Sequence, residues 1–296
     1  MINNSFFSVI IPTFNRAGFI RKTIESVLVQ SLQDFEIIVV DDGSTDNTEV
    51  VVKSITSDKI KYYKKENAER AAARNFGAKV STGIYINFLD SDDVVYPQHL
   101  QSAKKFSEAN AEAVIFHLGY DIKDQHGKLL RSVSNIQSIN QQILSGNILS
   151  CNGVFIRRAC IIDNQFNEDR SLSSLEDWEL WIRMSARFSF LNSNEITSTV
   201  IQHDERSVMT PDTSKIELKV ERFVRYVLED DMNKVRFGSG LNKAVASAWT
   251  YAALHLILAN EKRKVVLRYL FKGIRSCPKE MIKKRFFVIV KKLVGL

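Results

Sequence analysis

Short apolar runs alternate with helix-like segments over the first third of the chain, and this alternation constrains the fold most. The runs with strand character are Phe6–Ile11, Phe35–Val40, Ile60–Tyr63 and Ile84–Leu89. Between them lie Ala17–Gln30, Asn47–Ser54 and Ala71–Val80, which have helical spacing or helix-forming composition. Strands that alternate with helices are typical of an α/β fold. The pattern predicts an open, mostly parallel central sheet flanked by helices.

The alternation stops after about Asp204. Before that point, Val114–Tyr120 and Gly153–Ile156 suggest further strands and Leu175–Met184 a helix. The later segments all have helical spacing, namely Ile216–Leu228, Ala244–Leu258, Lys264–Arg275 and Lys279–Leu293. We therefore expect a catalytic-type α/β domain over residues 1–210 and a helical appendage over 211–296, with the boundary near Pro211.

Polar residues follow three of the predicted strands. Thr13 follows the first strand and Asp42 the second, while Asp90, Asp92 and Asp93 follow the fourth. Because ligands of open α/β sheets bind beyond the carboxyl ends of the strands, one crevice could collect these residues. Three carboxylates repel one another, and a hard divalent cation would relieve that repulsion. The spacing indicates a Mg²⁺ or Mn²⁺ site, although an acidic turn without a metal has the same sequence pattern.

The net charge of +7 is concentrated in the C-terminal segment. After residue 260, twelve Lys and Arg face two Glu, so this tail carries +10 and the rest of the chain −3. Its apolar positions, including Val266, Leu270 and Ile274, are interspersed with these cations, as in helices that lie on anionic membranes. Packing on the protein itself or in a homodimer would give the same pattern. No recognised nucleic-acid-binding module accompanies the tail, so we expect no nucleic-acid partner.

The composition indicates a globular intracellular protein. The chain is 45% hydrophobic and 25% charged, which suffices for a packed core. Its three cysteines form no disulfide framework, and the first residues lack the basic region of a signal peptide. We expect a cytoplasmic protein that contacts the inner face of the cell membrane through its basic tail.

Taken together, the motifs resemble those of the family 2 glycosyltransferases with the GT-A fold. The resemblance covers roughly residues 6–205 and rests on five ordered segments: Val9–Arg16 (Val-Ile-Ile-Pro-Thr-Phe-Asn-Arg), Val39–Asp46, Ala73–Asn75 with Gly77, Gly83–Asp93, and Glu176-Asp177-Trp178. It implies a metal-dependent, inverting transfer of a sugar from a nucleoside diphosphate, with a UDP-sugar as the expected donor. The acceptor would be a hydroxyl of a glycan or lipid-linked saccharide, in surface polysaccharide or glycan assembly.

The resemblance also implies roles in donor binding. Pro12, Thr13 and Phe14 would line the nucleotide pocket, although Phe14 could instead belong to the core. Asp42 would accept a hydrogen bond from the uracil or ribose, with a plain helix-capping turn as the alternative. Arg74 would contact the diphosphate, unless it is a cation on a helix surface. Ser91 would lie beside the bound donor.

Metal binding and proton transfer are implied for four further side chains. Asp92 would be the direct ligand, and Asp90 would contact the ribose or the ion through water. His203 would complete the metal site, or would be an ordinary surface or core histidine. Asp177 would be the base that removes the proton of the acceptor hydroxyl, although a carboxylate at a helix start also has a structural role.

One departure from the family pattern concerns the loop before Ala73. Family members often have Asn-x-Gly there, whereas this chain has Asn67-Ala68-Glu69-Arg70. Loss of the glycine removes conformational freedom and puts nucleotide contacts from the loop in doubt.

Other function classes fit the sequence less well. No Gly-x-Gly-x-x-Gly of dinucleotide-binding folds and no Gly-x-x-x-x-Gly-Lys of P-loop enzymes is present. A non-catalytic or regulatory nucleotide-sugar-binding protein of the same fold remains the alternative. Such a protein is expected to lack Asp92 or Asp177, and both are present.

Overall fold

The computed structural model describes residues 5–203 and 215–295, which form two compact units. The first, here called the sheet unit, comprises Met1–Ile139, Leu149–Arg170 and Phe188–Asp204. The second, the helical unit, comprises Asn140–Ile148, Ser171–Arg187 and Glu205–Leu296. The chain thus enters the helical unit twice before its C-terminal part, and Asp177 belongs to that unit. The boundary expected near Pro211 lies outside the described residues.

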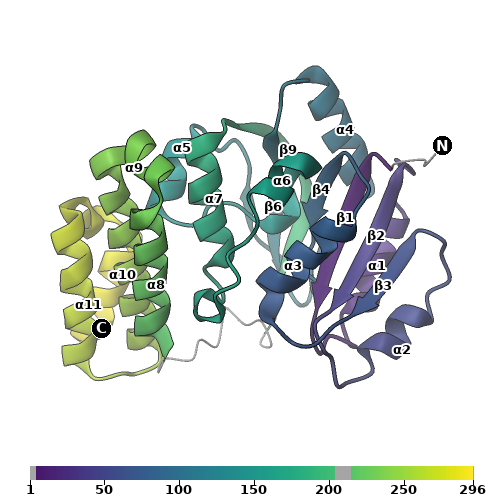
Figure 1. Cartoon of the computed structure of the whole chain (residues 1–296). Helices are drawn as coiled ribbons and strands as arrows, with labels where there is room; N and C mark the ends of the chain where they lie inside the picture. The colour runs from purple at the N-terminus through teal and green to yellow at the C-terminus, as the bar shows by residue number, and fades with distance from the viewer. Residues whose placement is uncertain (1–4, 204–214, 296) are drawn as a thin grey trace. The chain divides into compact units, whose positions relative to one another are not determined.

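The sheet unit is built on one mixed sheet (Figure 1). Its order is β3-β2-β1-β4-β8-β6-β9-β5, and β7 pairs with β6. The bounds are β1 Phe7–Thr13, β2 Phe35–Asp41, β3 Ile60–Lys64, β4 Tyr85–Phe88, β5 Val94–Val95, β6 Ile115–Asp124, β7 Leu129–Val133, β8 Val154–Arg157 and β9 Phe190–Gln202. The strands β1 to β4 are mutually parallel, whereas β8 is antiparallel to both of its neighbours. The predicted α/β class is confirmed. Parallel pairing joins the strands β1 to β4 and also β6 with β9, whereas the remaining pairs are antiparallel.

Helices cover both faces of the parallel strands β1, β2 and β4, as the uninterrupted burial of these three strands requires. These helices are α1 Ile20–Leu28, α2 Thr48–Lys53, α3 Glu69–Val80, α4 His99–Ala109 and α6 Arg158–Asp163. Val9, Val39 and Ile24 of α1 belong to one buried cluster. The alternate residues Ile10 and Val40 lie against α3, where a Cβ added at Gly77 would overlap Ile10. Gly77 therefore permits the close approach of α3 to the sheet.

The helical unit is organised around α10, Leu241–Leu258, most of which is buried. Around it lie α8 Ile216–Glu229, α9 Asp231–Phe237, α11 Arg263–Ser276, a short 3₁₀ helix Pro278–Ile282 and α12 Lys284–Leu293. Two earlier segments complete the unit, α7 Glu176–Arg187 and the 3₁₀ turn Ile143–Ser145; the short α5, Ile139–Gln142, precedes that turn. No helix within residues 5–203 and 215–295 is long and apolar enough to cross a membrane.

Two expectations for the C-terminal segment need correction. Lys279–Leu293 is interrupted at Lys283, whose ψ of 146° is extended. The break lets both Glu280 and Arg285 turn toward α10, whereas a continuous helix would separate them by about 140° around its axis. In addition, Val266 and Leu270 are buried in the helical unit, so the apolar stripe expected to face lipid serves largely as core.

Candidate functional site

The polar residues that follow β1 and β2 lie at the same edge of the sheet. The amide of Asp42 donates to the carbonyl of Thr13 over 2.8 Å, so the two strand ends are directly joined. Asn15 lies next in the chain, with φ of 51°, and its amide donates to Ser44 Oγ over 2.8 Å. The first and second motifs therefore form one surface.

Thr13 and Phe14 are available for a ligand in different ways. Thr13 is buried, yet its Oγ1 has no hydrogen-bond partner among the residues that the structure describes. A buried hydroxyl without a partner is uncommon and often indicates a ligand or water position. Phe14 is 44% exposed, which excludes the core position considered for it. Pro12 precedes them inside β1 and is buried.

Asp42 is held by the loop that departs from the family pattern. Its carboxylate accepts hydrogen bonds from Lys65 Nζ over 2.7 Å and from the Ala68 amide over 3.0 Å. The neighbouring Asp41 has a structural role, because it accepts from the Ser44 amide and the Tyr62 hydroxyl. Burial and the Asp41 carboxylate raise the pKa of Tyr62 above its usual value. Lys65 was not identified from the sequence, because a lysine after a strand carries no distinctive signal.

Glu69 takes the backbone conformation that the missing glycine would adopt. Its φ is 73°, a left-handed conformation that costs about 1–2 kcal/mol for a residue with a Cβ. The loop thus keeps the path expected of Asn-x-Gly at an energetic cost. That path allows Asn67 Nδ2 to donate to the Asp42 carbonyl over 3.0 Å.

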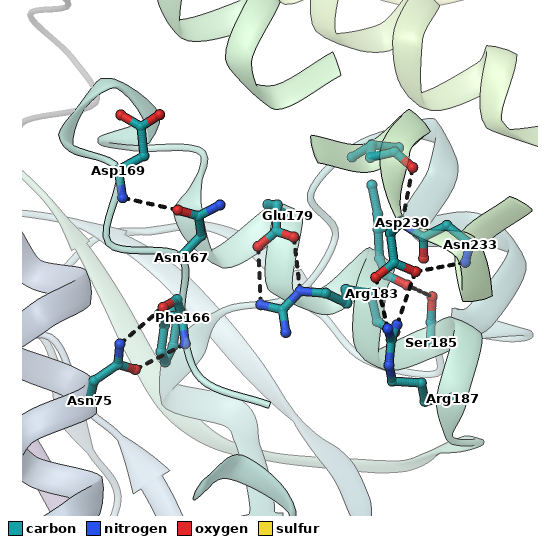
Figure 2. A network of polar contacts seen from close by, with 12 residues as sticks. Asn75, Phe166, Asn167, Asp169, Glu179, Arg183, Ser185, Arg187, Asp230 and Asn233 are labelled. Carbon is teal, nitrogen blue, oxygen red and sulfur yellow. Dashed lines mark hydrogen bonds and ion pairs between the residues drawn. The ribbon is translucent and has the colours of Figure 1, made fainter. Parts of the chain in front are cut away.

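Arg74 lies in the interior, not on a helix surface. It is 1% exposed, and its Nη2 donates to Asp90 Oδ1 over 2.8 Å. Its guanidinium carbon lies 5.1 Å from the centre of the Phe166 ring. Figure 2 shows how the next residue, Asn75, holds Phe166 in place through two backbone hydrogen bonds of 2.9 Å. In the Ala-Arg-Asn motif, Arg74 therefore contacts the acidic cluster, and Asn75 holds the phenylalanine against which Arg74 lies.

The three carboxylates gather after β4. Ligand oxygens of Asp90, Asp92 and Asp93 all lie within 4.8 Å of one another. Asp93 is fully buried and accepts from Asn152 Nδ2 over 2.9 Å and from the Ile201 amide over 2.8 Å. It anchors β9, which leaves Asp90 and Asp92 as the carboxylates nearest a ligand. Ser91, between them, is buried, and its carbonyl accepts from Thr23 Oγ1.

His203 joins this cluster from the end of β9. Its Nε2 lies 3.2 Å from Asp92 Oδ2, and its ring stacks on Phe19 at 4.5 Å between centroids. Its Nδ1 is buried and lacks a hydrogen-bond partner in the described part of the chain. Arg16 Nε lies 3.7 Å from the same Asp92 oxygen. Arg16 belongs to the first motif, but the sequence did not show that it reaches Asp92.

The donor set fits a hard divalent cation. Two carboxylates and one imidazole are accepted ligands of Mg²⁺ or Mn²⁺, which take their remaining positions from phosphate or water. The crowding of three carboxylates, with His203 Nε2 beside one of them, is what such a group would explain. Arg16 and Arg74 neutralise part of the charge in the described structure.

Asn152 is a further residue that the sequence did not indicate. It is fully buried, donates to Asp93, and its Oδ1 accepts from the Asp90 amide over 3.2 Å. It therefore fixes both ends of the acidic turn. An isolated asparagine far along the chain gives no signal of this role.

Asp177 lies in the second residue position of α7, in the helical unit. Its Oδ2 accepts from Asn147 Nδ2 over 2.8 Å, and its Oδ1 from the Trp178 amide over 2.7 Å. Trp178 is buried, donates to the Ile143 carbonyl and stacks on Phe223 at 4.4 Å, so it supports the helix. At its other end, α7 is tied through Arg187 to Asp230, as Figure 2 shows. These contacts fix the helix that carries Asp177.

Comparisons with known proteins give a consistent result. The family model described as glycosyl transferase family 2 matches residues 8–161. An uncharacterized glycosyltransferase of Rickettsia bellii is 36% identical over 223 residues, which cover 71% of this chain and 31% of the relative. A chondroitin synthase of Escherichia coli is 26% identical, covering 75% of this chain and 32% of that protein. The chain thus spans about a third of the length of these relatives.

Solved structures share the fold at lower identity. S. aureus TarS 1-349 in complex with UDP has a TM-score of 0.63 and 20% identity, covering 97% of this chain and 87% of that one. The mannosyltransferase PcManGT of Pyrobaculum calidifontis, in complex with GDP-Man and Mn²⁺, has a TM-score of 0.59 and 15% identity, covering 98% and 84%. Because the family model matches more than half of the length of this chain, the chain belongs to glycosyl transferase family 2.

Proposed function

We propose that this protein is a metal-dependent, inverting glycosyltransferase that uses a nucleoside-diphosphate sugar. The observation that carries the proposal is the convergence of Asp90, Asp92, Arg74 and His203 at the end of β4. A fold alone would not require this collection of charges, because like carboxylates repel one another. Binding of a metal ion and a diphosphate would account for this cluster of charged side chains.

The donor would be held by residues of the sheet unit. Thr13 Oγ1 and the exposed ring of Phe14 would meet the nucleoside, and Asp42 would accept from its base or ribose. The hydrogen bond from Lys65 Nζ holds the Asp42 carboxylate in place. Arg74 would bind the diphosphate with its planar guanidinium, which matches phosphate geometry.

Asp92, Asp90 and His203 would hold a Mn²⁺ or Mg²⁺ ion. A bound ion of this kind neutralises charge that develops on the departing nucleoside diphosphate. Arg74 would stabilise the same charge from the Asp90 side of the cluster. Ser91 and Asp93 maintain the turn that presents the ligands.

Asp177 would act as the base. The acceptor oxygen forms a bond to the anomeric carbon as the bond from that carbon to the diphosphate breaks, and the proton of the acceptor hydroxyl moves to Asp177. Attack from the face opposite the leaving group inverts the anomeric configuration. The hydrogen bond from Asn147 would orient the Asp177 carboxylate for this step.

The donor would be a UDP-sugar and the setting surface polysaccharide or glycan assembly. The motif resemblance supports this, and relatives named chondroitin synthase and a fold neighbour solved with UDP are consistent with it. The acceptor would be a glycan or a lipid-linked saccharide. The tail would bring the enzyme to a membrane surface from the cytoplasmic side, and a homodimer is an alternative use of the same helices.

A screen of donor hydrolysis tests the function directly. We expect one or more UDP-sugars to be hydrolysed slowly without acceptor, only when Mn²⁺ or Mg²⁺ is present. Binding of nucleotide sugar without hydrolysis or transfer, over a broad panel of donors and acceptors, would instead support a regulatory binding protein. Equal turnover in a chelator would remove the metal from the mechanism.

A further inference from the structure

Arg285 of α12 is held by the hydroxyl-bearing face of α10, and no ion pair joins it to a carboxylate within residues 5–203 and 215–295. Its Nη1 donates to the Ser247 carbonyl over 2.8 Å, to Ser247 Oγ over 3.3 Å and to Thr250 Oγ1 over 3.2 Å. Its Nε and Nη2 make no hydrogen bond to the residues that the structure describes. The outer edge of the guanidinium, formed by Nε and Nη2, can therefore donate hydrogen bonds to a ligand.

The surroundings of Arg285 make this arrangement costly in the absence of an anion. Burial lowers the pKa of the Arg285 guanidinium, and the nearest carboxylate, Glu280, opposes that effect. Glu280 is itself paired with Lys283 and accepts from Thr250 Oγ1. Burial lowers the pKa of His255 to about 4, with further contributions from Arg285 and Lys219. Positive charge therefore converges on this part of the helical unit.

A short segment connects Arg285 with the candidate base. The Ser145 carbonyl accepts from Ser247 Oγ over 2.9 Å and from Lys283 Nζ over 3.2 Å. Two residues further on, Asn147 donates to Asp177 over 2.8 Å. The segment that contains Ser145 and Asn147 thus contacts Ser247, which holds Arg285, and also contacts Asp177. All of these residues belong to the helical unit.

The pKa of Tyr251 is affected by the charges of both Arg285 and Asp177. Burial raises its pKa to about 12, the charge of Arg285 opposes that rise, and Asp177 and Glu176 add to it. Its ring lies 4.2 Å from that of His255, between centroids. Tyr251 therefore lies within electrostatic range of both Arg285 and Asp177.

We propose that the outer edge of Arg285, with Lys283, forms an oxyanion site that binds a phosphate or carboxylate group of the acceptor, whose reacting hydroxyl meets Asp177. Arginine binds both groups through two parallel hydrogen bonds, a geometry that a lysine cannot reproduce. The proposal rests on the glycosyltransferase function and narrows its acceptor to anionic glycans. A phosphodiester polymer and a uronate-containing glycan share the chemistry that the site recognises.

Binding of inorganic phosphate tests the site without any assumption about activity. Inorganic phosphate is titrated into the full chain saturated with UDP and the diamagnetic Mg²⁺, at constant ionic strength with chloride, and the ³¹P line width of its own resonance is followed. Arg285→Gln should weaken the binding by about 10- to 100-fold, as expected for loss of hydrogen bonds to a charged group. Arg275→Gln, at an exposed arginine of α11, is the matched control and should bind as the wild type does. Equal binding by wild type and Arg285→Gln would overturn the proposal.

Transfer assays then distinguish the source of the anion. The acceptors compared are a glycerol-phosphate oligomer, a uronate-containing oligosaccharide and a neutral oligosaccharide. We expect one charged acceptor to have the highest kcat/KM, and Arg285→Gln to raise its KM about 10- to 100-fold while the neutral acceptor changes little. A neutral acceptor that is used as well as the charged ones would contradict the site.

Two further measurements keep the outcomes separable. Arg285→Lys preserves the charge and removes the fork, so it should give an intermediate loss and serves if Arg285→Gln does not fold by circular dichroism. Donor hydrolysis without acceptor reports on the glycosyltransferase function alone. Absence of donor hydrolysis in the wild type would refute that function. The phosphate titration would still test whether Arg285 binds an anion.

Discussion

Nε2 of His203 lies 3.2 Å from Oδ2 of Asp92, although 111 positions separate the two residues in the sequence. The contact depends on β9, whose Ile201 amide is held by Asp93, the residue next to Asp92. One acidic turn therefore provides both the candidate ligand and the anchor that brings the histidine to it. Asp92 is therefore expected to bind the ligand, whereas Asp93 is expected to hold the fold.

Asp92→Ala should abolish Mn²⁺-dependent binding of UDP while leaving the fold intact. The substitution removes the carboxylate oxygen that both His203 and Arg16 contact. Asp90→Ala should weaken binding less. Isothermal calorimetry with and without Mn²⁺ measures both effects, and unchanged metal-dependent binding by Asp92→Ala would remove Asp92 from the site.

The adjacent Asp93 provides a control of opposite character. Because its buried carboxylate accepts from Asn152 and Ile201, Asp93→Ala leaves two buried donors without their partner. We expect a loss of stability of about 2–4 kcal/mol, with a lower Tm even in the absence of nucleotide. A Tm equal to that of the wild type would show that Asp93 does not anchor β9.

Asp177→Asn should separate donor binding from transfer. Asparagine nearly preserves the shape of the side chain but cannot take the acceptor proton, so transfer should fall about 10²–10⁴-fold. The KM for the donor and the Tm should change little. Asn147→Ala is the informative companion, because it removes a hydrogen bond that orients the carboxylate, so kcat should fall while the KM for the donor changes little. Transfer by Asp177→Asn near the wild-type rate would place the base elsewhere.

The sequence predicted the parallel core of the sheet because β1, β2 and β4 are buried on both faces and therefore read as apolar runs. It did not predict β9, a strand of thirteen residues rich in Ser, Thr and Asn. Two of its buried polar residues are satisfied by tertiary contacts, with 2.8 Å between Thr197 Oγ1 and His99 Nδ1 and 2.7 Å between Thr199 Oγ1 and the Tyr96 hydroxyl. Hydrophobic periodicity contains no information about such pairs.

The candidate site was predictable where it is local in sequence and hidden where it is not. Asp42 and the Asp90–Asp93 turn follow apolar strands, so their position at a strand end could be read directly. Lys65, Asn152 and Asn147 contact these residues or Asp177 from segments without a motif. Their roles arise from the tertiary path of the chain, which single-residue chemistry does not specify.

Glu69→Gly should stabilise the protein. Glycine adopts the φ of 73° without the clash of a Cβ, which is worth about 1–2 kcal/mol, and its greater freedom in the unfolded chain offsets part of that gain. We expect a net increase of about 0.5–1 kcal/mol in the free energy of unfolding, measured by urea denaturation. Glu69→Ala, which removes the carboxylate but keeps the Cβ, should give no such increase. A destabilised Glu69→Gly would show that the side chain contributes more than the strain costs.

The last prediction concerns the basic tail as a membrane-binding surface. With Val266 and Leu270 buried, the apolar residues left for lipid include Phe271, Ile282 and Phe287, which are 66%, 78% and 59% exposed. Each basic residue near an anionic surface adds about 1 kcal/mol, so the tail should bind anionic but not neutral liposomes, and salt should release it.

Point variants test this better than truncation, because removal of α11 would uncover the buried face of α10. We expect the triple variant Phe271→Ser, Ile282→Ser, Phe287→Ser to lose most co-sedimentation with anionic liposomes while keeping its Tm. Val235→Ser, at an apolar residue of α9 that is 83% exposed, is the matched control and should sediment as the wild type does. Equal sedimentation of the triple variant and the wild type would leave these helices as structural elements only.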